Sequence, residues 1–295
     1  MQSLKTLRRS PRLLAAVIVV VGLVAAATAY AATQQPAIQT ITPESESQMT
    51  NIDVLRQQIK NYYGAPLAKT GPTGTWTDPL NLDSNYAHEA EGVAASGTQY
   101  LDERREKGTS NTGPSKKAII LDVDDTSLAT FNYELYSNWD YNPATNADFV
   151  LDERFPAVPG MADMATKAAG ERYTVIYLTG RPATQETATV ENLEKVGFPA
   201  PTPLPTATLG GGADGVFTKP AISDYPSYLQ TACHDELSQD PPASCTTIHY
   251  KSATRAYVES LGYDIVGNFG DQFSDLTGGF ADRTFKLPNP NYYLP

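Results

Sequence analysis

Cysteine, histidine and methionine are scarce in this sequence of 295 residues, with two, three and four copies. Two cysteines are too few for a disulfide-stapled scaffold, and apart from His234 neither has a close Cys or His partner at zinc-ligand spacing. Positive charge is also limited: 22 Lys and Arg face 33 Asp and Glu, a formal charge of −11. This acidic balance disfavours nucleic acid polymers and anionic membranes as partners.

One long apolar run stands near the start of the chain, "LLAAVIVVVGLVAAATA". Basic residues precede it and the small-x-small tripeptide Ala29-Tyr30-Ala31 follows, which is the order of a secretory signal peptide. We expect residues 1–31 to be a cleaved signal peptide, the protein to be secreted, and no stable membrane insertion to remain. The alternative is an uncleaved membrane anchor, because the run approaches spanning length. Cleavage changes the charge from −11 to −15, since it removes four bases and no acid: Lys5, Arg8, Arg9 and Arg12.

The two cysteines are Cys233 and Cys245. In an oxidising compartment a disulfide between them is the expected state, and it would close a short loop. The alternative is a pair of free thiols.

The next segment, residues 32–50, is polar, contains two prolines and is expected to be a flexible linker. Residues 51–295 are expected to form one domain. Apolar residues at helical spacing predict a helix that starts after Asn51 and ends before Gly64. A second helical stretch is expected from residue 86 to residue 107. Together they predict an N-terminal helical extension.

From Lys117 onward, short apolar strands alternate with helical patterns. Strands are expected at 118–123, 172–178, 263–269 and 284–287. This alternation predicts an α/β fold with a doubly wound, mostly parallel sheet covered by helices on both faces. Ligands of such sheets bind beyond the carboxyl ends of the strands.

Polar residues follow three of the expected strands, and we expect them to converge at one edge of the sheet. Carboxylates crowded in this way are unfavourable unless a cation lies among them. Carboxylate and carbonyl oxygens suit a hard divalent ion such as Mg²⁺. A calcium EF-hand loop is disfavoured, because Ser127 and Tyr133 occupy the positions where such a loop requires Gly and Glu. The converging residues are Asp122, Asp124, Asp125, Thr126, Thr179, Arg181, Asp271 and Asp275.

Four motif positions occur in order along these strands: the Asp-x-Asp-x-Thr run 122–126, then Thr179, Lys251, and the pair Asp271 and Asp275. The arrangement resembles the haloacid dehalogenase superfamily. The ending "GNFGDQFSDLTGGFADRTFKLPNPNYYL" further resembles its acid phosphatase subfamily, which includes bacterial class B and C phosphatases and plant vegetative storage proteins. The resemblance implies a phosphate monoester hydrolase with an acidic optimum.

Roles for individual residues follow from the resemblance. Asp122 would be the nucleophile that forms an aspartyl-phosphate, and Asp124 the general acid and then base. Thr179 and Lys251 would hold the phosphoryl oxygens. Arg181 is expected to contact the substrate, with an ion pair at the rim as the alternative.

The implied Mg²⁺ ligands are the Asp122 side chain, the Asp124 carbonyl and Asp271. Asp275 would orient water or Lys251; the alternative is that it caps the following turn. Lys219 also follows an apolar stretch, but Lys251 is preferred because Ser252 and a helical pattern come after it.

Supporting roles are expected for four further residues. Thr126 is expected to hydrogen-bond its own loop, whereas Asp125 is expected to be solvated. His88 and His249 are expected to be structural rather than catalytic.

Residues 127–159 stand where a small cap would cover the site, and five aromatics lie in this insertion. They would either stack on a flat leaving group such as a nucleobase or form the core of the cap. The substrate is therefore expected to be a small phosphate monoester, with a nucleotide among the candidates. Two alternatives stay open: a non-catalytic storage or binding protein, and a phosphotransferase. The five aromatics are Phe131, Tyr133, Tyr136, Trp139 and Tyr141.

Overall fold

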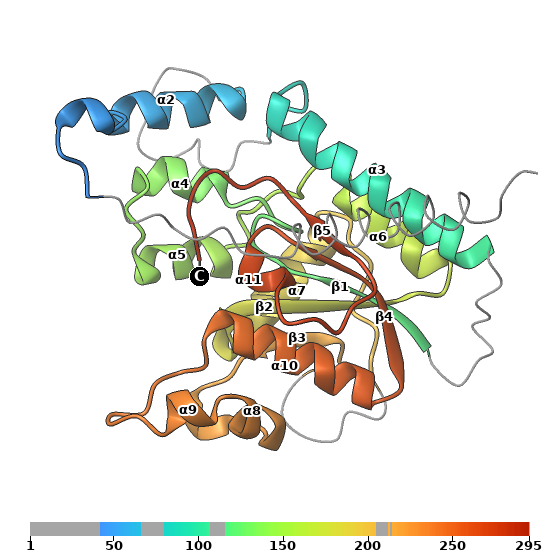
Figure 1. Cartoon of the computed structure of the whole chain (residues 1–295). Coiled ribbons are helices and arrows are strands. Elements are labelled where there is room, and N and C mark those ends of the chain that lie inside the picture. Colours follow the sequence, from blue (N-terminus) through green and yellow to red (C-terminus); the bar gives the residue numbers. More distant parts are fainter. Residues whose placement is uncertain (1–41, 66–79, 107–115, 205–211, 213, 295) are drawn as a thin grey trace, which may run out of the picture. The chain divides into compact units, whose positions relative to one another are not determined.

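A computed structural model describes residues 42–65, 80–106, 116–204, 212 and 214–294 (Figure 1). The expected signal peptide, most of the linker and the loop before the first strand lie outside the described residues. The described part of the linker, 42–50, is exposed and contains the 3₁₀ turn η1 (Glu46–Gln48). Within the described ranges, no helix has both the length and the apolar character needed to cross a membrane.

A five-stranded, wholly parallel sheet with strand order β3-β2-β1-β4-β5 forms the centre of the fold. This confirms the expected α/β class. The order reverses between β1 and β4, and such a reversal is where doubly wound folds bind ligands. The strands are β1 (Lys116–Leu121), β2 (Thr174–Pro182), β3 (Val216–Lys219), β4 (Tyr263–Gly270) and β5 (Thr284–Lys286).

Helices cover both faces of the sheet (Figure 1). Ile119 and Leu121 point into the core under α3 and α6, whereas Ala118 and Ile120 point into the core under α8 and α10. The alternation along β1 explains why the whole strand is apolar. The main helices are α2 (Ile52–Tyr62), α3 (Asn85–Glu106), α4 (Phe131–Ser137), α5 (Pro143–Leu151), α6 (Met161–Gly170), α7 (Glu186–Lys195) and α10 (Thr247–Ser260). The shorter ones are η2 (Ala183–Gln185), η3 (Ile222–Asp224), α8 (Ser227–Ala232), α9 (His234–Leu237) and α11 (Phe273–Leu276).

Three differences from the predicted strands bear on the site, and the other strand ends differ by one or two residues. β1 ends at Leu121 rather than at residue 123, because the chain leaves the sheet once Asp122 is reached. β2 continues beyond Leu178 through Thr179 to Pro182. β3 was not predicted, since four residues are too few to show a period.

The N-terminal extension packs against the segment expected to be the cap. Asn51 caps α2 as predicted, because its side chain accepts hydrogen bonds from the N–H groups of Asp53 and Val54. The ring of Tyr63 stacks on Phe131 of α4, with centroids 3.8 Å apart, and on Tyr86 of α3 at 4.1 Å. These rings join the extension to α4.

A disulfide joins Cys233 and Cys245, which confirms the expected pairing. Both sulfurs are buried between α8, α9 and the start of α10.

Removing this disulfide is expected to lower the free energy of unfolding by about 3 kcal/mol, because the bond closes a short loop in the unfolded chain. Urea unfolding of a Cys233→Ser/Cys245→Ser double variant measures the change. Neither cysteine belongs to the carboxylate cluster described below, so the rate of any reaction there should be preserved. Identical unfolding midpoints would contradict the prediction.

Candidate active site

Asp122 stands at the carboxyl end of β1, where its N–H donates to the carbonyl of Phe269 at 3.0 Å. The hydroxyl of Ser127 donates to the Asp122 carbonyl at 2.7 Å and so closes the loop after the strand. The carboxylate is 6% exposed. Its Oδ1 accepts from Lys251, while its Oδ2 has no hydrogen-bond partner among the described residues.

Lys251 lies between two carboxylates. Its Nζ donates to Asp122 Oδ1 and, at 2.6 Å, to Asp275 Oδ1. Burial alone would lower the pKa of Lys251, but the charges of Asp122 and Asp275 outweigh it and the pKa is raised. The ammonium is therefore charged, as phosphate binding requires. The expected choice of Lys251 over Lys219 is supported by position, because the Lys219 ammonium donates instead to the carbonyl of Cys245 at 2.7 Å.

Asp275 fulfils both of the functions considered for it. One oxygen binds Lys251, and the other accepts from the N–H of Gln272 at 2.8 Å, which caps the first turn of α11. Gly270 allows the close approach, since a Cβ there would lie 2.4 Å from the Cβ of Asp275. Asp275 is therefore buried rather than solvated.

Arg255, one helical turn after Lys251 on α10, supports the segment that follows Asp275. Its side chain is fully buried and donates to three backbone carbonyls, those of residues 275, 277 and 279, at 2.5 to 2.8 Å. Two successive turns of α10 thus hold the fourth motif: Lys251 binds the carboxylate of Asp275, and Arg255 binds the backbone carbonyls of the segment that begins at Asp275.

Asp271, at the carboxyl end of β4, is held by amide donors. Gln272 Nε2 and Asn289 Nδ2 each donate to its Oδ2 at 2.7 Å, and Thr126 Oγ1 donates to Oδ1 at 3.3 Å. Burial and the charges of Asp275 and Asp125 raise the pKa of Asp271 to about 7. Thr126 was expected to hydrogen-bond its own loop, but its hydroxyl contacts Asp271 of the fourth motif.

Three of these carboxylates could hold a metal ion. Oxygen atoms of Asp122, Asp271 and Asp275 lie within 4.8 Å of one another, and all three side chains are buried. Burial, together with Asp275, Asp271 and Asp124, raises the pKa of Asp122 despite the opposing charge of Lys251. A divalent cation reverses such shifts, and a cluster of three buried carboxylates fits a hard ion.

Asp124 is absent from that cluster because its carboxylate faces Arg181. The guanidinium donates to both oxygens, from Nη2 at 2.7 Å and from Nε at 3.1 and 3.2 Å. Of the two possibilities for Arg181, this structure shows the ion pair. Arg181 also donates to Thr189 at 2.9 Å, and its backbone N–H donates to the buried Thr179 hydroxyl at 3.1 Å.

The expectation that Asp125 is solvated was wrong. Asp125 is fully buried, with a φ of +52°, and accepts from the N–H of Thr130 at 2.9 Å and its hydroxyl at 2.5 Å. Asn289 donates to it at 3.3 Å. Burial outweighs these bonds and raises the pKa of Asp125 to about 7. These bonds to Thr130 and Asn289 make Asp125 a support of the loop.

Asn289 and Gln272 were not identified from the sequence. Both lie in the ending that carries the resemblance, but amides have no charge or metal-ligand pattern that singles them out. His88 is exposed on α3, and His249 faces Glu236 at 2.5 Å.

Four of the five aromatics in the expected cap fall into a buried pair and an exposed pair. Phe131 and Tyr133 are buried, and Tyr133 donates a hydrogen bond to the Asn142 carbonyl at 2.9 Å. Tyr136 and Tyr141 are 45% and 66% exposed. The first pair therefore belongs to the core, and the second pair is accessible to a ligand.

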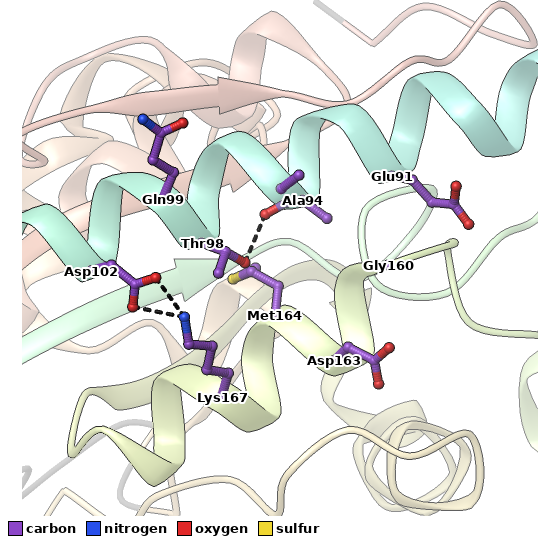
Figure 2. Close-up of a pocket in the computed structure, with 10 residues that line it drawn as sticks. Glu91, Ala94, Thr98, Gln99, Asp102, Gly160, Asp163, Met164 and Lys167 are labelled. Carbon is purple, nitrogen blue, oxygen red and sulfur yellow. Dashed lines mark hydrogen bonds and ion pairs between the residues drawn. The ribbon is translucent and has the colours of Figure 1, made fainter.

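A separate shallow groove of about 510 Å³ lies between α3 and α6 (Figure 2). None of the site residues lines it. Lys167, the one cation among its lining residues, binds both oxygens of Asp102 at 2.6 and 2.7 Å. The groove thus presents no unpaired cation to a phosphate.

Residues 37–295 match the family model described as HAD superfamily, subfamily IIIB (acid phosphatase). The chain belongs to this family. The resemblance stated from the motifs is thereby confirmed, and the five-stranded parallel sheet is that of a HAD-like α/β fold.

Individual relatives match a smaller part of the chain than the family model does. The stem 28 kDa glycoprotein of Glycine max is 29% identical over 61% of this chain and 61% of its own length. Acid phosphatase 1 of Solanum lycopersicum is 31% identical over 59% of this chain and 58% of its own. The chain thus spans about three fifths of the length of these relatives. The class C acid phosphatase structure from Bacillus anthracis gives a TM-score of 0.47 at 21% identity, covering 70% of this chain and 80% of that one.

Glu134→Gln is expected to remove a pH-dependent loss of stability. Burial raises the pKa of Glu134 from 4.5 to about 7. Between these values the folded state keeps a proton that the unfolded state has released, so the free energy of unfolding falls as the pH rises. Above pH 7 the free energy of unfolding of the wild type is lower by about 3 kcal/mol for this reason, and the Glu134→Gln variant does not show this loss.

Urea unfolding of both proteins at about pH 5 and about pH 8 tests this prediction, with the variant gaining relative to the wild type only at the higher pH. An equal difference at both pH values would contradict it.

Proposed function

We propose that this protein is a secreted, Mg²⁺-dependent acid phosphatase that hydrolyses small phosphate monoesters through an aspartyl-phosphate. The observation that carries the proposal is the position of Asp122. Its Oδ1 binds Lys251, its Oδ2 has no partner among the described residues, and Asp271 and Asp275 lie beside it. A buried carboxylate next to a fixed cation is suited to attack a phosphate drawn to that cation.

In the first step, Asp122 Oδ2 attacks phosphorus and the bond from phosphorus to the leaving oxygen breaks. Asp124 gives its proton to that oxygen, so the alcohol leaves neutral. In the second step, water attacks the phosphorus of the aspartyl-phosphate while Asp124 takes its proton, and the bond to Asp122 breaks. The products are an alcohol and phosphate, and both carboxyl groups return to their first state.

Thr179 and Lys251 would hold the transferring group. Thr179 stands on β2, next to β1, and its hydroxyl accepts from the Arg181 N–H, which leaves its own proton for a phosphoryl oxygen. Lys251 supplies a charge that Asp275 fixes in place. Donors held before substrate binds require little reorganisation during reaction.

Asp122, the Asp124 carbonyl and Asp271 would hold Mg²⁺, with Asp275 behind them orienting Lys251. When bound, the ion supplies charge that offsets repulsion between the carboxylates and an anionic phosphate.

Secretion is supported by the order of basic, apolar and small residues at 1–31 and by the Cys233–Cys245 disulfide, which is favoured in oxidising compartments.

Asp122→Asn is expected to lower kcat for an aryl phosphate by at least about 10³, because an amide oxygen is a poor nucleophile. The assay compares the wild type and the variant after chelation and after return of Mg²⁺. Wild-type activity should vanish with the chelator and return with the metal. A folded wild type that turns over no substrate with any divalent ion would overturn the phosphatase proposal and favour a binding or storage protein.

Asp124→Asn is expected to separate the two steps. A nitrophenolate leaves without protonation, so Asp122 still becomes phosphorylated, but the second step lacks its base. Rapid mixing should therefore show a burst of nitrophenol equal to the enzyme concentration, and mass spectrometry should place one phosphoryl group on Asp122. Steady turnover without a burst would argue against this assignment of Asp124.

Added alcohol in the wild-type assay distinguishes a phosphotransferase from a hydrolase, because a phosphotransferase forms the phosphorylated alcohol.

A further inference from the structure

Glu134 is a nearly buried carboxylate without a partner. It lies in α4, is 6% exposed, and its side chain makes no hydrogen bond or ion pair with any described residue. Burial alone accounts for its raised pKa, so no positive charge in the described part of the chain offsets it. Such a carboxylate lowers stability, and residues of this kind are concentrated at functional sites.

Glu134 lies close to the loop that follows β1. Its N–H donates to the carbonyl of Thr130 at 3.3 Å, one turn earlier, and Thr130 in turn binds Asp125. Glu134 is close enough to Asp125 to raise the pKa of that group. Tyr141 is subject to the charges of both Asp124 and Glu134, with burial as the larger effect on its pKa. Glu134 is thus held one helical turn after Thr130, the residue that fixes Asp125 in the loop directly after Asp124.

The cations of the site are already engaged by other carboxylates. Lys251 binds Asp122 and Asp275, and Arg181 binds Asp124. A ligand that brings its own positive charge would pair with Glu134, whereas a second negative charge on the ligand would be repelled by it. The ring of Tyr141, 66% exposed, offers a surface that attracts a cation.

We propose that Glu134 binds a protonated amine on the leaving group, and that the preferred substrates are phosphate monoesters of amino alcohols. This inference rests on the phosphatase activity proposed above and narrows its substrate class. The carboxylate forms a charge-assisted hydrogen bond with the ammonium, which orients the ester oxygen toward Asp124. Glu134 is thus a specificity residue, and it takes no part in the bonds that form and break.

Three phosphate esters of similar size test the proposal: phosphoethanolamine with a cationic end, ethyl phosphate with a neutral end, and phosphoglycolate with an anionic end. Values of kcat/KM are measured at about pH 8, where Glu134 is ionised. For the wild type, phosphoethanolamine should exceed ethyl phosphate by about tenfold or more, and phosphoglycolate should be the poorest substrate. An aryl phosphate reports the basal activity.

Glu134→Gln keeps the shape of the side chain and removes its charge. It should bring phosphoethanolamine down to the level of ethyl phosphate and raise phosphoglycolate, while the aryl phosphate, which carries no amine, reports whether the site still turns over. Asp140→Asn is the matched control, since it removes an exposed charge after α4 and should alter no ratio. Thermal unfolding shows that each variant is folded.

An unchanged ratio of phosphoethanolamine to ethyl phosphate in Glu134→Gln, with the aryl phosphate still hydrolysed, would overturn this inference and leave the phosphatase proposal standing. A wild type that prefers phosphoglycolate would overturn it as well. Absence of aryl phosphate turnover in the wild type would overturn both proposals together.

Discussion

The bridge that Lys251 makes between Asp122 and Asp275 is the interaction on which the rest of the site depends. Asp122 follows β1 and Asp275 lies in α11. These two buried carboxylates repel each other, and an ammonium between them turns that repulsion into attraction. The bridge sets where α10 lies against β1 and β4. It engages only one oxygen of Asp122 and leaves the other without a hydrogen-bond partner among the described residues.

Much of the remaining polar structure positions this bridge. Arg255 and the capped turn of α11 fix Asp275, while Asn289 and Gln272 supply neutral donors to Asp271. Neutral donors satisfy a carboxylate without cancelling its charge, so Asp271 stays able to bind a cation. Among the described residues of the site, Lys251 and Arg181 pair with its carboxylates, whereas Arg255 binds only backbone carbonyls. Amides and hydroxyls hold Asp125 and Asp271.

The sequence predicted the fold class and the convergence of Asp122, Asp271 and Asp275, because apolar strands that end in polar residues have few arrangements in a parallel sheet. Lys251 was identified only through the family resemblance. It did not predict the environment of Asp125. That side chain depends on Asn289, 164 residues away, and on a loop conformation with positive φ. Glu134 was missed for a related reason: an acid in a polar and aromatic helix looks solvated until the packing around α4 is known.

The distance along the chain between the two ends of the site has a consequence for biosynthesis. The carboxylates of Asp125 and Asp271 share one amide donor, Asn289. During synthesis the first motif is therefore made long before residue 289 is added. Asp125 and Asp271 gain this shared donor only when nearly the whole chain exists, so this part of the site is completed last.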